Sequence, residues 1–412
     1  MINREEVQEI VKKAQYNTPL IGVLGSHSAL DVCDGAIDEG FNTVVWSQKK
    51  RELPYLKYFK TLRDDNGNVV KGCVDQVRLL PKFKEIIKEE EQKWMTENGV
   101  LFVPNRSFVS YVGIERVEDE FNVPMVGSRN LLGIEERGKR EKDYYWLLEH
   151  PETNKDILRT PEVISPKELT ELDELVIVKL HHAVHKLERG FFTAANWEEF
   201  REKAKRLIER KIVPACPQCN GEGCNTCYYT GINNIEHARI EKYSLGPVFN
   251  FNFFYSPVSE AKREVPLELL GIDSRFETSL DALVRLPAEQ QLRLSEKQRD
   301  PTYIVVGHHS VSLRESLLNR AFEMAEEFIR ITKELFSPGM IGAFCIQTTI
   351  EDDMKPTVYD ISTRIGGGTN SHIWLGAPYG NMTWRERMSS GRRTALEIKR
   401  ALKYNLLPEI VT

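Results

Sequence analysis

The chain has 412 residues, 41% of them hydrophobic and 28% charged, a length and composition typical of a folded protein with two or three compact units. Its formal net charge is −5, with both signs interspersed, so the basic face of a nucleic-acid-binding protein is not expected. Residues 1–15 predict an amphipathic helix without a signal-peptide core, and no apolar run approaches the ~20 residues of a membrane-spanning helix; we therefore expect a cytoplasmic protein with no membrane partner.

The N-terminal part of the chain has the pattern of a parallel α/β unit. Residues 19–25 (PLIGVLG) predict a strand, residues 29–40 have helical spacing, and residues 42–47 (NTVVWS) predict a second strand. Further strands are predicted at 99–105 and 123–127. A charged, helical stretch begins there, so we expect a domain boundary near residue 127.

A second region with helices and strands follows this boundary. Residues 174–180 (ELVIVKL) predict a strand, residues 196–211 a helix capped by Asn196, and residues 248–257 a strand of period two. The remaining predicted elements are a helix at 312–336, strands at 340–350 and 357–365, the turn GGGTN at 366–370, and a closing helix around 382–405. The expected fold class is therefore α/β or α+β.

Two loops at strand ends are candidate binding sites. The loop at 25–30 (GSHSAL), with His27, follows the first predicted strand, where open α/β sheets bind ligands and the next helix offers N–H groups to an anion. Residues 102–113 form a second junction of this kind, with hydroxyl groups and Arg106. Each can also be read as an ordinary solvated loop.

The last two predicted strands carry a candidate cation and phosphate site. Gln347 and Asp360 occupy alternating positions on strands expected to be neighbours, so their oxygen atoms could share a Mg²⁺ ion. Arg364 and the turn 366–370 then supply a guanidinium group and backbone amides suited to phosphate. The alternative interpretation is a polar edge in a β-ladder.

A lysine and three histidines follow the predicted strand 174–180. Lys179 can place its charge on a nucleotide phosphate, or extend to solvent. His181 stands beside His182 and His185, and the last two could face one metal from a helical turn, although no third ligand is evident.

Four cysteines form the pattern C-x2-C-x4-C-x2-C and predict a bound metal. Two cysteines at this spacing chelate tetrahedral Zn²⁺ from one turn, and Gly221 and Gly223 permit the tight reversal between the pairs. An iron–sulfur cluster, disulfides or free thiols remain alternatives. Because a four-cysteine zinc site is closed, we expect a structural role. The cysteines are Cys216, Cys219, Cys224 and Cys227.

Long segments of the chain resemble the archaeal formate-dependent AICAR ligases (FAICAR synthetases) of the ATP-grasp superfamily; AICAR is 5-aminoimidazole-4-carboxamide ribonucleotide. The resemblance runs through GSHSAL, FVPNRSFVSYVG, LLGIDSRFETSLDALVRLPA, SLRESLLNRAFEMAEEF, PGMIGAFCIQ and ISTRIGGGTN. It implies an ATP-grasp fold, with a Rossmann-like substrate domain at 1–127 and an ATP-grasp domain at 128–412. Within the latter, a subdomain of about 140–245 would cover the nucleotide, and the cysteines would lie in a zinc-binding insertion at 214–236, which also resembles one unit of the DnaJ zinc module.

The resemblance also implies a reaction and a set of site residues. AICAR, formate and ATP would give the formylated nucleotide FAICAR through formyl phosphate, in a homo-oligomer that uses Mg²⁺ or Mn²⁺. The implied residues are His27, Ser107 and Ser279 for AICAR; Gln347 and Asp360 for Mg²⁺; Lys142, Lys179, Glu241 and Lys242 for ATP; and Arg364, Thr369 and Asn370 in the closing loop.

The chain departs from the family pattern at four places. Residues 181–190 lack the glycines of a phosphate-covering loop, and Lys242 stands where a ribose-binding glutamate is expected. Ser279 replaces an expected asparagine and Asp360 an expected glutamate. These changes keep open two alternatives: a ligase for a different carboxylate and amine, and a non-catalytic nucleotide-binding or interaction protein.

Overall fold

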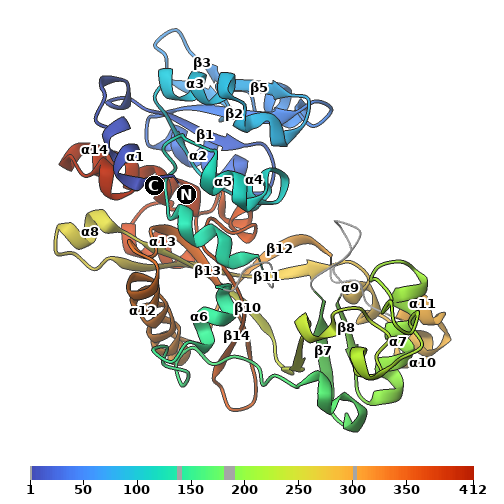
Figure 1. Ribbon diagram of the computed structural model, residues 1–412. Helices are drawn as coiled ribbons and strands as arrows, with labels where there is room; N and C mark the ends of the chain where they lie inside the picture. Colours follow the sequence, from blue (N-terminus) through green and yellow to red (C-terminus); the bar gives the residue numbers. More distant parts are fainter. Residues whose placement is uncertain (1, 137–141, 181–190, 300–303) are drawn as a thin grey trace.

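The computed structural model describes residues 2–136, 142–180, 191–299 and 304–412. Figure 1 shows an N-terminal sheet with its helices at the top, a larger sheet below it, and a small sheet at the right. The segment 181–190, with His181, His182 and His185, lies outside the described residues. In the described part of the chain, no helix has the length and apolar character needed to cross a membrane.

The N-terminal body is a four-stranded parallel sheet in the order β5-β2-β1-β6. The first two strands are apolar runs with buried side chains on both faces, as parallel sheets require. The predicted strands at 19–25 and 42–47 are confirmed, and the one predicted at 99–105 is confirmed as the shorter strand Val100–Phe102. The elements are α1 (Arg4–Ile10), β1 (Leu20–Leu24), α2 (Ala29–Asp38), β2 (Asn42–Gln48), β3 (Leu62–Arg63), β4 (Val69–Lys71), β5 (Gln76–Leu80), α3 (Glu89–Glu97), β6 (Val100–Phe102), α4 (Arg106–Val112) and α5 (Ile114–Asp119).

The strand predicted at 123–127 is wrong in its extent. Met125 pairs in parallel with Phe102, while Val126 pairs antiparallel with Val411. The segment changes its partner within one residue, so it makes two single bridges and no ladder.

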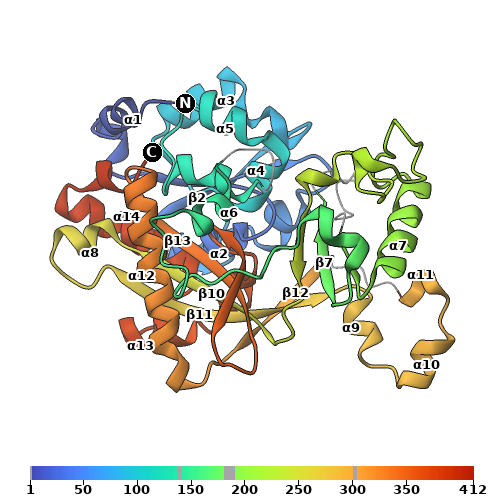
Figure 2. The ribbon, with the colours of Figure 1, turned by 60° about the horizontal axis from the view of Figure 1, so that its bottom comes forward.

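The central body is a five-stranded antiparallel sheet in the order β12-β11-β10-β13-β14. In β10, Phe251 and Phe253 pack in the core beneath α12, while Asn250 and Asn252 lie on the opposite face; Figure 2 shows α12 lying along the sheet. The elements are β10 (Val248–Tyr255), α8 (Pro257–Ala261), β11 (Leu267–Glu277), β12 (Val305–Val311), α12 (Leu318–Leu335), β13 (Gly342–Ile350) and β14 (Pro356–Ser362).

The third body covers one end of the central sheet. It is an antiparallel sheet in the order β8-β7-β9, on which α7 packs through an apolar face that includes Phe200 and Ala204. The short helices between β11 and β12 lie beside it in Figure 1. The elements are β7 (Val176–Lys179), β8 (Phe191–Ala194), α7 (Trp197–Glu209) and β9 (Arg239–Lys242), and the short helices beside them are α9 (Leu280–Leu283), α10 (Ala288–Arg293) and α11 (Glu296–Arg299). Helix α6 (Tyr144–Glu149) precedes this body in the chain and packs in the core of the central sheet.

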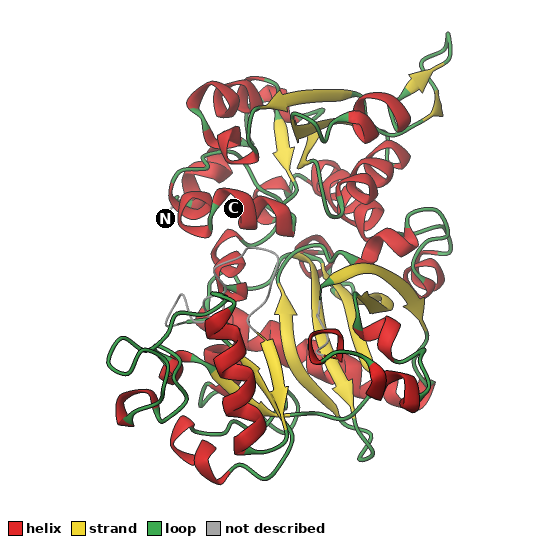
Figure 3. Cartoon of the chain, turned by 90° about the vertical axis from the view of Figure 1, so that its right-hand side faces the viewer, coloured by secondary structure: helices red, strands yellow, loops and turns green. Residues whose placement is uncertain are grey.

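The closing helix predicted around 382–405 is two helices, α13 (Pro378–Trp384) and α14 (Ser390–Tyr404). Arg385 takes a left-handed conformation, and the Ser389 side chain caps the second helix at Arg392 N. Helix α14 returns to the N-terminal body and crosses α2 closely, because a Cβ atom on Gly35 would lie 2.1 Å from the Arg392 backbone. Figure 3 shows the N-terminal sheet above the five-stranded sheet, with both chain ends beside their junction.

Candidate active site

One row of polar side chains crosses four strands of the central sheet. Asp273 on β11 is aligned with Asn250 on β10, which is aligned with Gln347 on β13, which is aligned with Asp360 on β14. The predicted adjacency of Gln347 and Asp360 is therefore confirmed. Adjacent strands lie about 4.8 Å apart, so the row spans about 14 Å.

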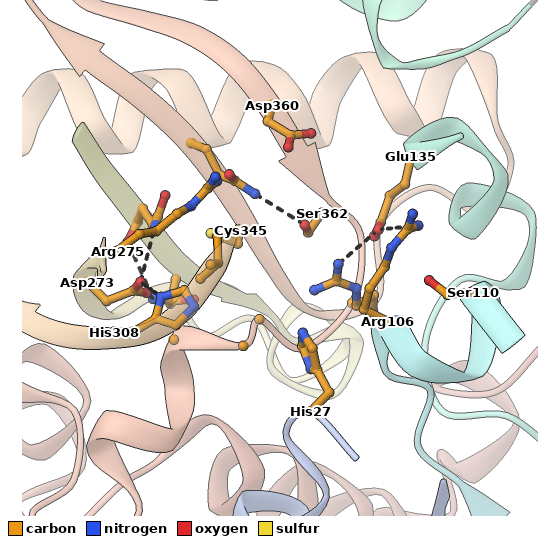
Figure 4. Close-up of a pocket in the computed structure, with 18 of the residues that line it drawn as sticks. His27, Arg106, Ser110, Glu135, Asp273, Arg275, His308, Cys345, Asp360 and Ser362 are labelled. Carbon is orange, nitrogen blue, oxygen red and sulfur yellow. Dashed lines mark hydrogen bonds and ion pairs between the residues drawn. The ribbon is translucent and has the colours of Figure 1, made fainter. Parts of the chain in front are cut away.

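A cavity of about 920 Å³ lies over this row, between the central sheet and the N-terminal body (Figure 4). His27 from the loop after β1, Arg106 and Ser110 from α4, the loop after β14, and side chains of the small-sheet strands form the rest of its wall. Most of these side chains are polar or charged. The cavity therefore suits a polar, anionic molecule better than an apolar one.

His27 is held by the loop that follows β14. Its backbone carbonyl accepts a hydrogen bond from Asn370 Nδ2 at 2.8 Å, and a Cβ atom on Gly367 would lie 3.0 Å from His27 Nε2. Burial lowers the pKa of His27 well below its ordinary value, and the charges of Arg364, His308 and Arg106 lower it further. The imidazole is therefore neutral at pH 7 and can both donate and accept a hydrogen bond.

Two arginines in this wall are already paired with carboxylates. Arg364 Nη2 lies 3.0 Å from Glu135 Oε2, and Arg106 Nη1 lies 2.8 Å from Glu136 Oε1. Arg364 also donates to the Ile365 carbonyl and is buried. A phosphate bound by Arg364, as predicted, would therefore have to compete with Glu135 for the guanidinium group.

Thr369 and Asn370 form hydrogen bonds that hold the predicted closing loop in place. Thr369 Oγ1 donates to the Gly366 carbonyl at 3.0 Å and is buried. Asn370 lines the cavity while its amide holds the His27 loop. Both side chains therefore fix the loop against its neighbours.

A second cavity of about 570 Å³ separates the small sheet from the central sheet. Lys179, Phe191, Arg275 and Asp360 line both cavities, which therefore meet at these side chains. Lys179 Nζ lies 2.5 Å from Glu241 Oε2 and donates to Tyr145 Oη at 2.8 Å. The buried Glu241 also accepts from Arg239 at 2.6 Å, so β7 and β9 present a paired cation–carboxylate cluster.

Four predicted site residues do not line the first cavity. Lys242 lines the second cavity but forms ion pairs at 2.9 Å with Glu162 and at 3.2 Å with Glu174. Lys142 is exposed, with its ammonium group 5.2 Å from the Trp146 ring centroid. Among the described residues, the first cavity is lined by Ser110 and not by Ser107, which is buried one turn earlier in α4, and Ser279 precedes α9 beside the second cavity.

Sequence reasoning missed the residues that complete the polar row. Asp273 and Arg275 lie on β11 and His308 lies on β12, two strands that were not predicted. The available signal was a charged residue inside the apolar run LLGIDSRF, which indicates a buried polar group that needs partners.

The four cysteines lie together, as a metal site requires. Their ligand atoms all lie within 4.8 Å of one another, and the Sγ–Sγ distances are 3.9 Å for Cys216–Cys224, 3.7 Å for Cys219–Cys227 and 3.8 Å for Cys224–Cys227. Tetrahedral zinc with Zn–S bonds of about 2.3 Å places its sulfur atoms about 3.8 Å apart. The backbone N–H groups of Gly223 and Gly231 donate to Cys219 Sγ and Cys227 Sγ.

This cysteine module belongs to the core of the small-sheet body. Cys216 N donates to the Gly231 carbonyl, which closes the module at its base. Ile232 and Ile235 pack in the same apolar cluster as Phe200 of α7 and Ile240 of β9. Loss of a bound metal would therefore loosen the connection between α7 and β9.

Comparisons with known proteins point to one group. Residues 21–159 match the family described as "Protein of unknown function (DUF1246)", and residues 227–412 match "Domain of unknown function (DUF1297)". The chain is 35% identical over 412 residues to the 5-formaminoimidazole-4-carboxamide-1-(beta)-D-ribofuranosyl 5'-monophosphate synthetase of Methanocaldococcus jannaschii, with all of both chains covered. It is 34% identical over 411 residues to the protein of the same name from Methanobrevibacter smithii, with 100% of this chain and 99% of the relative covered.

Solved structures agree with these relatives. The crystal structure of the IMP biosynthesis protein PurP from Thermococcus kodakaraensis matches with a TM-score of 0.62 and 25% identity, over 95% of this chain and 100% of that one. N5-carboxyaminoimidazole synthetase from Staphylococcus aureus matches with a TM-score of 0.51 and 11% identity, over 93% and 77% of the two chains, a likeness of fold alone.

Proposed function

The chain belongs to the family of archaeal FAICAR synthetases and has an ATP-grasp fold, and from this premise we propose that it is an ATP-dependent ligase that makes FAICAR from AICAR, formate and ATP. The observation that carries the proposal is the meeting of the two cavities at Lys179, Arg275 and Asp360. A nucleotide in the second cavity would present its terminal phosphate to a substrate in the first.

The proposed reaction needs the ATP phosphates and the formate to meet, as they could where the two cavities join. Formate is a poor electrophile, because its carboxylate would have to lose an oxide. Transfer of the terminal phosphoryl group of ATP to formate gives formyl phosphate, which the 5-amino group of AICAR then attacks. Phosphoryl transfer depends on positioning and on neutralising negative charge. Lys179 and Arg275 would supply fixed positive charge at that point.

We assign Mg²⁺, or Mn²⁺, to Gln347 and Asp360. Gln347 Oε1 is buried and has no hydrogen-bond partner in the described part of the chain, and Gln347 is aligned with Asp360 across the strand pair. An amide oxygen and a carboxylate suit a hard cation. The ion would add charge neutralisation at the phosphate oxygens.

His27 is the residue that we assign to AICAR. It lines the first cavity beside Arg106 and Ser110, where an anionic ribonucleotide would meet a cation and neutral hydrogen-bonding groups. The Lys179–Glu241 pair lies on the nucleotide side, and we assign it to ATP.

The His27→Ala enzyme should lose kcat/KM for AICAR by about 10- to 100-fold, the effect of removing one or two hydrogen bonds to a charged substrate. KM for ATP should change little, because His27 lines only the first of the two cavities. Steady-state kinetics measure both values. His237, an exposed histidine outside both cavities, provides the control as His237→Ala. An unchanged kcat/KM for AICAR in His27→Ala would contradict the assignment of His27 to AICAR binding.

The decisive assay is consumption of AICAR that depends on both ATP and formate. Formation of FAICAR with release of ADP and phosphate supports the proposal. Release of ADP only with another carboxylate or amine would identify a different ligase. Tight nucleotide binding without turnover would identify a nucleotide-binding protein.

We further propose that the cysteine module holds structural Zn²⁺. The sulfur spacing supports this choice, and so does the closed shell of four thiolates, which leaves no position for a substrate. The proposal also includes the homo-oligomer and the cytoplasmic location expected from the sequence. Analytical ultracentrifugation tests the oligomer, and fractionation of cells tests the location.

A further inference from the structure

Asp273 and His308 form a carboxylate–imidazole pair at the end of the polar row opposite Asp360. Asp273 Oδ1 lies 2.7 Å from His308 Nδ1, and the Asp273 side chain is 1% exposed. Asp273 also accepts hydrogen bonds from Asn250 Nδ2 at 2.8 Å and from Asn252 Nδ2 at 2.6 Å. Three donors therefore hold this carboxylate in one position.

The pairing sets the state of the imidazole. A carboxylate only accepts hydrogen bonds, so His308 Nδ1 carries a ring proton, and in the neutral imidazole Nε2 is the nitrogen with the lone pair. His308 lines the first cavity, with its side chain 19% exposed. Figure 4 shows the Asp273–His308 pair and His27 around the same opening.

Gly368, in the loop after β14, packs closely against the Asp273 carboxylate. A Cβ atom on Gly368 would lie 2.1 Å from Asp273 Cγ, so only glycine permits this contact. The loop that carries Asn370, and so fixes His27, therefore also fixes the Asp273–His308 pair. An imidazole held in this way by a carboxylate is the arrangement of a general base with its orienting group.

Other candidate bases that line this cavity are less suited, and Glu135 and Glu136 are already paired with Arg364 and Arg106. Burial holds the pKa of His27 well below its ordinary value, so its imidazole is a weak base. Asp360 belongs to the proposed cation site at the far end of the row.

We propose that His308, oriented by Asp273, is the general base for the attack of the AICAR amine on formyl phosphate. This inference rests on the proposed function and assigns its second chemical step. The row of about 14 Å leaves space for the terminal phosphate and the formyl group between Asp360 and the pair.

The step balances as follows. The amine lone pair forms the C–N bond, and one amine proton passes to His308 Nε2. The C–O bond to the phosphoryl group breaks, and its electron pair leaves with the phosphate. The Asp273 carboxylate stabilises the imidazolium, which then returns its proton to the released phosphate.

A single-turnover experiment on the full chain separates the two steps. Enzyme in excess over ATP, with formate and AICAR present, is quenched at short times, and ADP and FAICAR are measured in the same samples. In His308→Gln, ADP should form at nearly the wild-type rate, whereas FAICAR should form about 100-fold more slowly, the usual effect of losing a general base. Asp273→Asn should give the same pattern, and exposed His237→Gln should match the wild type.

Two results would overturn the inference while the proposed function stands. One is FAICAR formation at the wild-type rate in His308→Gln. The other is equal slowing of ADP and FAICAR together with a lower melting temperature, which would show that the pair only supports the fold. A wild-type enzyme that makes no FAICAR would instead overturn the proposed function, and this inference with it.

Discussion

The Asp360→Ala enzyme should lose nearly all ligase activity, with kcat lowered by about 1000-fold at saturating ATP and Mg²⁺. The physical reason is charge: a cation that neutralises phosphate oxygens contributes several kcal/mol to the transition state, and each 1.36 kcal/mol is a factor of ten in rate. Without Asp360, Gln347 offers only a neutral amide oxygen. Steady-state kinetics across a Mg²⁺ titration measure the loss.

A binding measurement separates the cation site from the chemistry. Calorimetry should show that Mg²⁺ strengthens nucleotide binding to the wild type and not to Asp360→Ala, while AICAR binding is retained. The control is Asp352→Ala, which removes an exposed carboxylate from the turn between β13 and β14. If Asp360→Ala keeps its activity at saturating Mg²⁺, Gln347 and Asp360 are only a polar strand edge.

The Cys224→Ser protein should lose its stoichiometric zinc and unfold at a lower temperature. Metal bound only by the folded state stabilises that state, and its removal takes this contribution away. If the free energy of unfolding of the small-sheet body falls by about two or three kcal/mol, its melting temperature should fall by about 10 °C or more. Calorimetry should show a separate early transition, because the module packs in the core around Phe200 and Ile240.

Activity and metal analysis complete this test. Assayed well below its melting temperature, Cys224→Ser should keep most of its turnover, since its sulfur lies in a closed shell and lines neither of the two cavities. The control is Cys33→Ser, a buried cysteine of α2 far from the module in sequence, which should retain one zinc per chain. If metal analysis of the wild-type protein finds iron, together with visible absorbance, the four cysteines hold an iron–sulfur cluster and the zinc assignment is wrong. A folded but inactive Cys224→Ser would place the module in the active site.

Several features were decided by local sequence alone. The alternation in VFNFNFFY predicted a strand with one apolar and one polar face, and Phe251 and Asn250 occupy those faces. The spacing of Cys216 and Cys219, repeated at Cys224 and Cys227, predicted sulfur atoms close enough to share a metal. The positions of Gln347 and Asp360 predicted that the two residues would be neighbours on adjacent strands, and they are paired in the register of β13 and β14. The first two inferences depend on periodicity or on separations of a few residues, and the third depends on two strands that follow one another directly in the chain.

Other features depend on residues that only the fold brings together. His308 on β12 contacts Asp273 on the neighbouring strand β11, and the two residues are 35 positions apart in the sequence. Arg364 and Glu135, which form an ion pair, are 229 positions apart. Neither partner can be chosen from sequence patterns, because a strand edge or an acidic loop residue has many available partners until the register is set. The same holds for Ser107 and Ser110, where one helical turn decides which hydroxyl faces the cavity. The sequence by itself determined the residue types and local elements of this ligase, and the tertiary structure decided which charges neutralise one another, because burial and pairing are properties of the packed sheet.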